Sequence, residues 1–398
     1  MAKKTVLKRI YDAFFGFTIM EGGTAEEVFD FLDGLPEPKD DLDRSVLQYR
    51  GEMYYVSAGR RVAGNVACLV AFLPLMVWIV ASTLFRPMQS ERSDMALVYF
   101  AAPHISSLLI PSEELEGTDP ASVVRVTTSF DPLKLRLDRR GWSLLLKSAV
   151  RARFEPFFVA KALVKLSQAG HIVYAYAPVK VVTNTESSFS TSVLTSYFEG
   201  QGIDYIGIMH GEFFANSKAS FFRFTRFYAW DDYYKGLLLR QRCEENQIRI
   251  STPPSLNVPG YVPSTKPTYD ITYYCQLEDD ETKARLASAL GALQAEGMRC
   301  RVRLHPLSLR GDYEDIFPSG VELEPEGLSL GESLSVTSRV AGRCSTVLYQ
   351  SFRLGIPVII DDYSDRGEYS SLQSKGYRML DAPHELMSNL LKERDSID

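Results

Sequence analysis

Hydrophobic and polar positions alternate along most of this 398-residue chain in a way that predicts strands followed by helices. From residue 95 onward, short apolar runs give way to polar residues, as expected of buried strands that end in loops. The strands predicted in the first half lie at residues 96–100, 123–127, 180–183, 205–209 and 226–230. Amphipathic segments predict helices at residues 188–200 and 233–246.

A proline-rich passage separates this first series of elements from a second one. It contains Pro253, Pro254, Pro259, Pro263 and Pro267, and such a cluster marks a linker. After it, strands are predicted at residues 270–275, 300–304, 339–342 and 357–360, and helices at 279–296, 331–337 and 346–354. Because strands that alternate with helices form parallel sheets, the sequence predicts an α/β fold with two Rossmann-like domains facing a cleft.

The predicted domain boundaries follow from these patterns. We expect an N-terminal helical region at residues 1–92, an acceptor-side domain at 93–262 and a nucleotide-binding domain at 263–398. Within the first region, residues 62–85 carry no charged side chain and are long enough to cross a bilayer.

Three interpretations of this apolar segment compete. It is a transmembrane span, a re-entrant hairpin kinked at Pro74, or a buried core helix. The basic N-terminus, with Lys3, Lys4, Lys8 and Arg9, favours the hairpin, because both of its ends stay in the cytoplasm. No cleavable signal peptide precedes it.

A stretch of basic and aromatic residues favours membrane contact as well. Residues 136–165 combine eight lysines and arginines with Trp142, Phe154, Phe157 and Phe158, a composition that suits an anionic lipid surface. The alternative is a solvated helix face. The expected location is the cytoplasmic face of an inner membrane, peripheral or re-entrant.

Composition excludes several other classes. The formal net charge of -6 argues against a nucleic-acid partner, since such proteins carry a basic excess. The five cysteines and five histidines are scattered, with no spacing typical of a zinc site or a disulfide framework. We therefore expect a reducing compartment and no bound metal.

The first candidate site is His305 with Pro306, at the end of a predicted strand that also contains Arg303. In open α/β sheets, ligands bind beyond the carboxyl ends of the strands, and the proline ends the strand there. An imidazole at this point can donate to a phosphate oxygen. The alternative is a histidine that only caps a loop.

The second candidate site is Ser345 with Thr346, at a junction between a strand and a helix. Hydroxyls and free backbone N–H groups at a helix start bind anions. The alternative is an ordinary helix cap, a role that serine and threonine fill in most proteins.

Three residues of the first half are candidates for a general base. His210 closes one predicted strand, with Glu212 two residues later, and Glu186 follows another strand. A positioned carboxylate or imidazole can take the proton of an acceptor hydroxyl. The alternatives are a structural histidine and a carboxylate that only interacts with a helix dipole.

These motifs carry a resemblance to a known group of enzymes. The His305-Pro306 pair, the Ser345-Thr346 pair and the run from Gly355 to Asp361 resemble the C-terminal half of bacterial GT-B transferases. The nearest groups are sialyltransferases and polysialyltransferases, capsule and lipopolysaccharide Kdo transferases, and CDP-glycerol glycerophosphotransferases. The resemblance implies that His305, Ser345 and Thr346 bind the donor phosphate. The His210-Gly211 step also resembles the first half of those enzymes.

The resemblance implies a glycosyltransferase that moves a sugar from a nucleotide-activated donor, with a CMP-sugar favoured, to a capsule or lipopolysaccharide glycan. The acceptor is a glycan or a lipid-linked glycan, the reaction is inverting and metal-independent, and no cofactor is needed beyond the nucleotide-sugar substrate. Cys344 stands where those families often have the first of two serines, which leaves the donor sugar open.

Three alternatives stand beside this interpretation. The first is a CDP-alcohol phosphotransferase of teichoic-acid-like polymer synthesis, which uses the same pocket. The second, of another class, is a non-catalytic GT-B scaffold in a membrane assembly complex. The third is a nucleotide-sugar epimerase of the same fold, against which the apolar segment argues.

Overall fold

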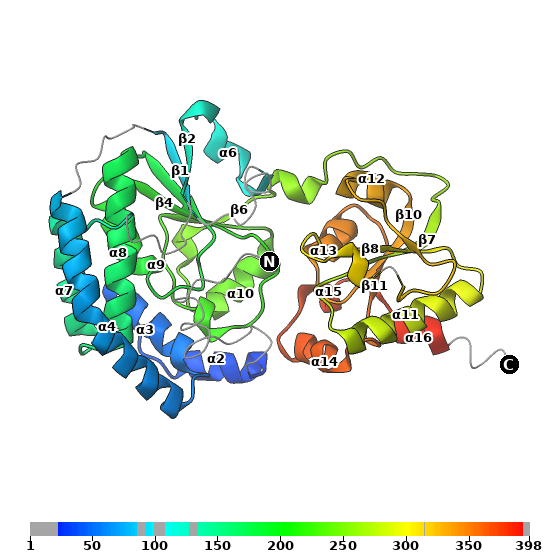
Figure 1. Cartoon of the computed structure of the whole chain (residues 1–398), viewed down its shortest axis with the longest axis horizontal. Coiled ribbons are helices and arrows are strands. Elements are labelled where there is room, and N and C mark those ends of the chain that lie inside the picture. Colours follow the sequence, from blue (N-terminus) through cyan, green and yellow to red (C-terminus); the bar gives the residue numbers. More distant parts are fainter. Residues whose placement is uncertain (1–22, 86–92, 99–107, 127–133, 314, 393–398) are drawn as a thin grey trace. The chain divides into compact units, whose positions relative to one another are not determined.

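The computed structural model describes residues 23–85, 93–98, 108–126, 134–313 and 315–392 (Figure 1). Its contacts divide the chain into two compact units. Unit 1 comprises residues 1–210 and 215–253, and unit 2 comprises residues 211–214 and 254–398. The division between Pro253 and Pro254 falls inside the proline-rich passage.

Unit 1 is built on the first series of strands and helices. Its helices are α2 (Ala25–Asp33), α3 (Asp41–Met53), α4 (Ala58–Phe85), α6 (Ser112–Leu115), α7 (Arg139–Arg151), α8 (Pro156–Tyr176), α9 (Thr191–Glu199) and α10 (Asp232–Arg240). Its strands are β1 (Met95–Val98), β2 (Val123–Val126), β3 (Lys180–Thr183), β4 (Asp204–Ile208), β5 (Arg226–Ala229) and β6 (Ile248–Ile250). Short 3-10 turns occupy Pro120–Ser122, Ser217–Ala219 and Glu245–Gln247.

The six strands of unit 1 form a parallel sheet in the order β2-β1-β3-β4-β5-β6. The apolar residues that predicted these strands form the core, with Val182, Ile206 and Ile208 almost fully buried. The strand order reverses between β1 and β3, so the loops after these two strands flank the point at which parallel sheets bind ligands.

The N-terminal helices α2 and α3 belong to unit 1. The side chain of Gln48 in α3 donates to the carbonyl of Glu186 at 2.7 Å, and Ser45 accepts from the backbone N–H of Val193 at 3.2 Å. Gly51 allows a close approach, because a Cβ there would lie 2.2 Å from the carbonyl oxygen of Ser217. The helical region at the start of the chain therefore completes the core of unit 1.

The prediction of a re-entrant hairpin at residues 62–85 is wrong, because these residues belong to one continuous helix, α4. It runs unbroken through Pro74, which is exposed, and it packs against α8. The buried-core alternative is also wrong, because only 11% of its most apolar 18-residue window is buried. Among the described residues, α4 is the helix that is long and apolar enough to cross a membrane.

Two other expectations for unit 1 also need correction. The helix predicted at residues 233–246 ends at Arg240, because Arg242 takes the left-handed conformation with a φ of 66°. In the basic stretch, Phe157 and Phe158 are buried and Lys161 turns inward to pair with Glu52 at 3.0 Å. Part of that stretch therefore faces the core rather than a lipid surface.

Unit 2 is built on a second series of elements. Its strands are β7 (Tyr269–Tyr274), β8 (Cys300–Arg303), β9 (Glu322–Leu323), β10 (Thr337–Gly342), β11 (Val358–Ile360) and β12 (Glu385–Leu386). Its helices are α11 (Asp280–Ala295), α12 (Leu330–Ser335), α13 (Thr346–Arg353), α14 (Arg366–Ser374), α15 (Arg378–Asp381) and α16 (Met387–Lys392), with 3-10 turns at Pro254–Asn257 and Arg310–Asp312.

The strands of unit 2 also form one parallel sheet, in the order β12-β11-β10-β7-β8-β9. Its core contains Ile271, Tyr273, Val302 and Ile359, packed against Leu290 of α11. The predicted fold class, two parallel α/β domains with an apolar helix near the N-terminus, is thereby confirmed.

Candidate functional site

The best-defined site of unit 2 lies where its sheet reverses direction. The chain adds β8 and β9 on one side of β7, and β10, β11 and β12 on the other. The loops that follow β7 and β10 therefore flank a crevice at the carboxyl ends of the strands. Gln276 follows β7, and its side-chain amide donates to the carbonyl of Cys344, which follows β10.

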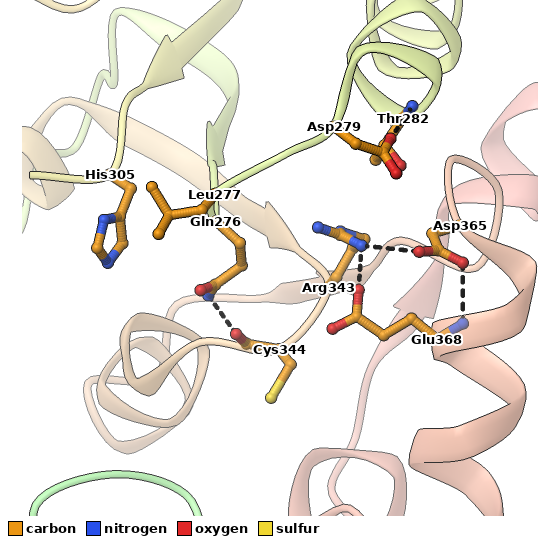
Figure 2. A pocket seen from close by; sticks show the side chains of 9 residues that line it. All are labelled: Gln276, Leu277, Asp279, Thr282, His305, Arg343, Cys344, Asp365 and Glu368. Carbon is orange, nitrogen blue, oxygen red and sulfur yellow. Dashed lines mark hydrogen bonds and ion pairs between the residues drawn. The ribbon is translucent and has the colours of Figure 1, made fainter. Parts of the chain in front are cut away.

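A cavity of about 460 Å³ opens at this point (Figure 2). Its size falls within the range of roughly 300–1,000 Å³ that is usual for small-molecule sites. It is lined by Gln276, Leu277, Asp279, Thr282, His305, Arg343, Cys344, Asp365 and Glu368. These residues come from loops after four strands and from the first turns of α11 and α14, so the sheet itself gathers them.

His305 lies where the sequence places it, just beyond the end of β8, and it lines the cavity. Its Nδ1 atom accepts a hydrogen bond from the backbone N–H of Leu307 at 3.2 Å. Burial lowers the pKa of His305, which keeps the ring neutral at pH 7. A neutral ring whose Nδ1 accepts carries its proton on Nε2, so this atom is a hydrogen-bond donor.

Arg343 forms the charged centre of the cavity wall. Its guanidinium is buried and bonds to Glu278 and Glu368, and to Asp365 at 3.2 Å. Burial raises the pKa of Glu278 and Glu368, although Arg343 acts in the opposite direction. Figure 2 shows Arg343 between the residues of α14 and the loop after β7.

The charges of this cluster do not suit a phosphate. One arginine faces three carboxylates, so this part of the wall is acidic, and the two carboxylates that line the cavity, Asp365 and Glu368, are acceptors. Acceptors of this kind suit the hydroxyl groups of a sugar or a ribose. A phosphate would have to bind at the other end of the cavity, near His305 and Cys344.

The second predicted pair lies next to that end. Ser345 is the N-cap of α13, and its Oγ accepts from the backbone N–H of Val347 at 3.3 Å. Thr346 is the first residue of the helix. Neither side chain lines the cavity, whereas the preceding residue, Cys344, does. The first turn of α13 contains no acidic residue, which leaves its positive end uncompensated within the helix.

Two other predicted donor-site residues lie outside the cavity lining. The guanidinium of Arg303 bonds to Glu324 and donates to the carbonyl of Leu328 at 3.0 Å. Pro306 is exposed after His305. The arginine that lines the cavity is Arg343. Sequence patterns singled out only Ser345 and Thr346 from the segment that contains it.

Glu186 lies in unit 1, in the loop after β3 beside the reversal point of that sheet. Its side chain is buried, and Oε2 has no hydrogen-bond partner within the described part of the chain. Burial raises its pKa to about 8. With this pKa the carboxyl group is mostly protonated at pH 7, so only the deprotonated fraction could act as a base.

The other two candidate bases lie in different units. His210 follows β4 in unit 1, and desolvation lowers its pKa, so the ring is neutral at pH 7. Glu212 was expected in the first domain, but residues 211–214 belong to unit 2, where Phe214 packs on Tyr377 with ring centroids 5.7 Å apart. Burial and then the Glu212 carboxylate raise the pKa of Cys344.

Sequence reasoning missed several residues of the cavity. Gln276 directly follows a predicted strand, so the rule that found His305 could also have found it. Asp365 and Glu368 begin α14, a helix that no pattern singled out, and only folding brings them to Arg343. Within the described ranges, no group of three or more histidine, cysteine, aspartate or glutamate residues is arranged to hold a metal ion.

No protein-family model matches the sequence, and no curated protein matches it. Among solved structures, the wall teichoic acid polymerase TagF is 12% identical over 84% of this chain and 87% of that chain, with a TM-score of 0.44. UDP-GlcNAc 2-epimerase from Neisseria meningitidis, bound to UDP-GlcNAc, is 11% identical over 76% and 90%, with a TM-score of 0.44.

A third structure, UDP-N-acetylglucosamine 2-epimerase from Rickettsia bellii, is 10% identical over 68% of this chain and 78% of that chain, with a TM-score of 0.42. At these identities and TM-scores the likeness carries no argument about the fold family or the activity of this chain. None of these three structures is a sialyltransferase or a Kdo transferase.

Proposed function

We propose that the protein is a transferase that binds a nucleotide-activated sugar in the cavity of unit 2 and moves the sugar to a surface glycan. One observation carries this proposal. The Leu307 N–H group holds His305 in the tautomer whose Nε2–H can donate to a phosphate oxygen. The amino end of α13 follows Cys344, which lines the cavity, and in this proposal its backbone N–H groups are additional donors for the phosphate.

The acidic side of the cavity fits the rest of such a ligand. Asp365 and Glu368 can accept hydrogen bonds from hydroxyl groups, and Gln276 adds an amide that can donate and accept. A ligand with a phosphate at one end and hydroxyl groups at the other matches this division. Nucleotide sugars have this chemistry, and the preference for a CMP-sugar rests on the family resemblance alone.

In the proposed reaction, an acceptor hydroxyl oxygen attacks the anomeric carbon while the bond from that carbon to the donor phosphate breaks. The hydroxyl proton passes to a base, for which Glu186, His210 and Glu212 remain the candidates. The leaving phosphate keeps the bonding electrons, and His305 with the start of α13 stabilises its charge. Inversion and transfer without a metal or a further cofactor belong to the proposal, and activity should survive EDTA.

Purified protein incubated with nucleotide sugars and a glycan acceptor tests this function. We expect release of the free nucleotide and a lengthened glycan without phosphorus. A phosphodiester in the product, detected by phosphorus NMR, would instead identify the CDP-alcohol phosphotransferase. Epimerised donor without transfer would identify an epimerase. The absence of turnover with every donor would favour the non-catalytic scaffold.

The base is tested by single substitutions. Glu186→Gln, Glu212→Gln or His210→Ala should lower turnover by on the order of 10²-fold, because general bases contribute roughly 10²–10⁴-fold. The variant that lowers turnover in this way should bind the nucleotide with the same affinity as the wild type. Normal turnover in all three variants would exclude all three residues from the mechanism.

A further inference from the structure

Helix α4 has two apolar faces, of which only one is covered. Gly64, Ile79 and Ser82 are buried on the side that packs against α8. The other side exposes a stripe of aliphatic residues at helical spacing: Val62, Val66, Leu69, Val70, Leu73 and Val77. Val70 and Leu73 are 72% and 70% exposed. A surface helix of a water-soluble domain presents polar residues there, so this face requires a partner.

The helix is fixed to unit 1 near both of its ends. The side chain of Asn65 accepts from the backbone N–H of Phe157 at 2.9 Å and donates to Glu155 at 3.0 Å. The hydroxyl of Thr83 accepts from the backbone N–H of Leu137 at 3.2 Å. Because these contacts span 18 residues, or about 27 Å of helix, α4 cannot cross a bilayer without detaching from the fold.

The segments on either side of α7 contact opposite ends of α4. Leu137, which contacts Thr83, lies two residues before α7, and Phe157, which contacts Asn65, lies six residues after it. Helix α7 also packs against α8 and exposes Leu146 and Val150 one turn apart. Phe154, near the start of α4, is 66% exposed.

The charges on and near α4 indicate which kind of partner covers its exposed face. Neither α4 nor α7 contains an aspartate or a glutamate. Exposed basic residues stand near both ends of α4, with Arg60 and Arg153 at its start and Arg139 at its end. The carboxylates near these two ends, Glu155 and Asp138, already accept hydrogen bonds within unit 1. An apolar face flanked by exposed cations suits acyl chains beneath anionic headgroups.

We propose that unit 1 docks on an anionic lipid bilayer through α4, which lies in the plane of the interface instead of crossing it. The exposed aliphatic stripe enters the acyl boundary, and Arg60, Arg139 and Arg153 meet the headgroups. This inference is independent of the cavity in unit 2. It replaces the hairpin predicted from the sequence with a continuous helix that remains packed on α8.

The test is flotation of the full chain with vesicles of phosphatidylcholine, with and without one-quarter phosphatidylglycerol. We expect binding to the anionic vesicles that weakens at least tenfold in Leu69→Glu/Leu73→Glu, while Val179→Glu, an exposed aliphatic position elsewhere in unit 1, changes nothing. Unfolding curves of all variants should coincide, since the replaced side chains are exposed. Unchanged vesicle binding by the double variant would overturn the proposal.

Two further readouts separate the remaining outcomes. A fluorophore on Val70→Cys should shift to the blue with vesicles. Labels at Ser57→Cys and Phe85→Cys, which lie at the two ends of α4 and outside the exposed stripe, should both be quenched by a membrane-impermeant quencher added from outside. Protection of one of these two labels would show a transmembrane helix. If the wild type is a dimer that does not bind vesicles and the double variant is a monomer, a second copy of the chain covers this face. Either result contradicts docking in the plane.

Discussion

The backbone N–H of Leu307 donates to Nδ1 of His305 at 3.2 Å, and this contact fixes which nitrogen of the ring faces outward as a donor. Leu307→Pro removes the N–H group and should lower nucleotide affinity several-fold, because the ring can then adopt the other tautomer. Leu307→Ala keeps the N–H group and is the matched control. Equal affinities of the two variants, measured by calorimetry, would show that the tautomer is irrelevant.

The N-cap of α13 allows stability and ligand binding to be separated. Ser345→Ala removes the cap and should lower the free energy of unfolding by about 1 kcal/mol. Ser345→Asp should keep the cap, since aspartate caps helices well, but its negative charge should weaken nucleotide binding at least tenfold. Denaturant titration and calorimetry measure the two effects. Full affinity in Ser345→Asp would remove the start of α13 from the phosphate site.

Arg343 should be the most stability-sensitive residue of the cavity. Arg343→Met leaves three carboxylates near one another without their cation, and loss of one partner of a buried pair costs about 3–5 kcal/mol. Arg339→Met, which removes a partly exposed pair with Glu385, should cost less than about 1 kcal/mol.

A second substitution shows whether the cost of Arg343→Met is electrostatic. Adding Glu278→Gln removes one of the three charges and should restore part of the lost free energy of unfolding, measured by denaturant titration. A double variant that is less stable than Arg343→Met alone would point to packing rather than charge.

The burial of Glu186 predicts a pH dependence of stability. Its pKa is raised to about 8, so the folded chain keeps a proton that the unfolded chain loses near pH 4.5. Stability from this group is therefore complete below about pH 4.5 and is lost as the pH rises towards 8. Glu186→Gln cannot ionise, so its stability should rise relative to wild type by up to about 1.4 kcal/mol per pH unit between those values.

Thermal or denaturant unfolding at pH 5, 6.5 and 8 measures this difference. Glu116→Gln, at an exposed position of the same unit, should follow the wild-type pH dependence. A constant difference between Glu186→Gln and wild type across the series would mean that Glu186 is ionised in the folded protein.

The sequence predicted the parts of the site that local patterns determine. His305 was found because a buried apolar strand ends there, and in the structure it lines the cavity. Ser345 was found because a strand passes directly into a helix, and it is the cap of that helix. Both depend on neighbours in the chain, so alternation and capping rules suffice.

The remainder depends on contacts between distant residues. Arg343 meets Glu278 and Glu368, which are 65 and 25 residues away, and no local pattern pairs them. Glu212 belongs to unit 2 and not to the predicted first domain, and its neighbour Phe214 packs on Tyr377 of that unit. For α4, Pro74 suggested a hairpin, but continuous packing on α8 keeps the helix in one piece.

The central claim is that the cavity of unit 2 binds a nucleotide phosphate through His305. Calorimetry of the wild type and His305→Ala with CMP, CDP, UDP and GDP tests it most directly. His384→Ala is the control, since this histidine lies in the same unit outside the cavity and bonds to the Ala382 carbonyl. We expect binding, tightest for a cytidine nucleotide, that weakens in His305→Ala by about 1.5–3 kcal/mol, the range for a hydrogen bond to a charged group. Preference for UDP would change the assigned donor nucleotide but leave the phosphate site in place. Equal affinity in the wild type and His305→Ala would contradict the phosphate site itself.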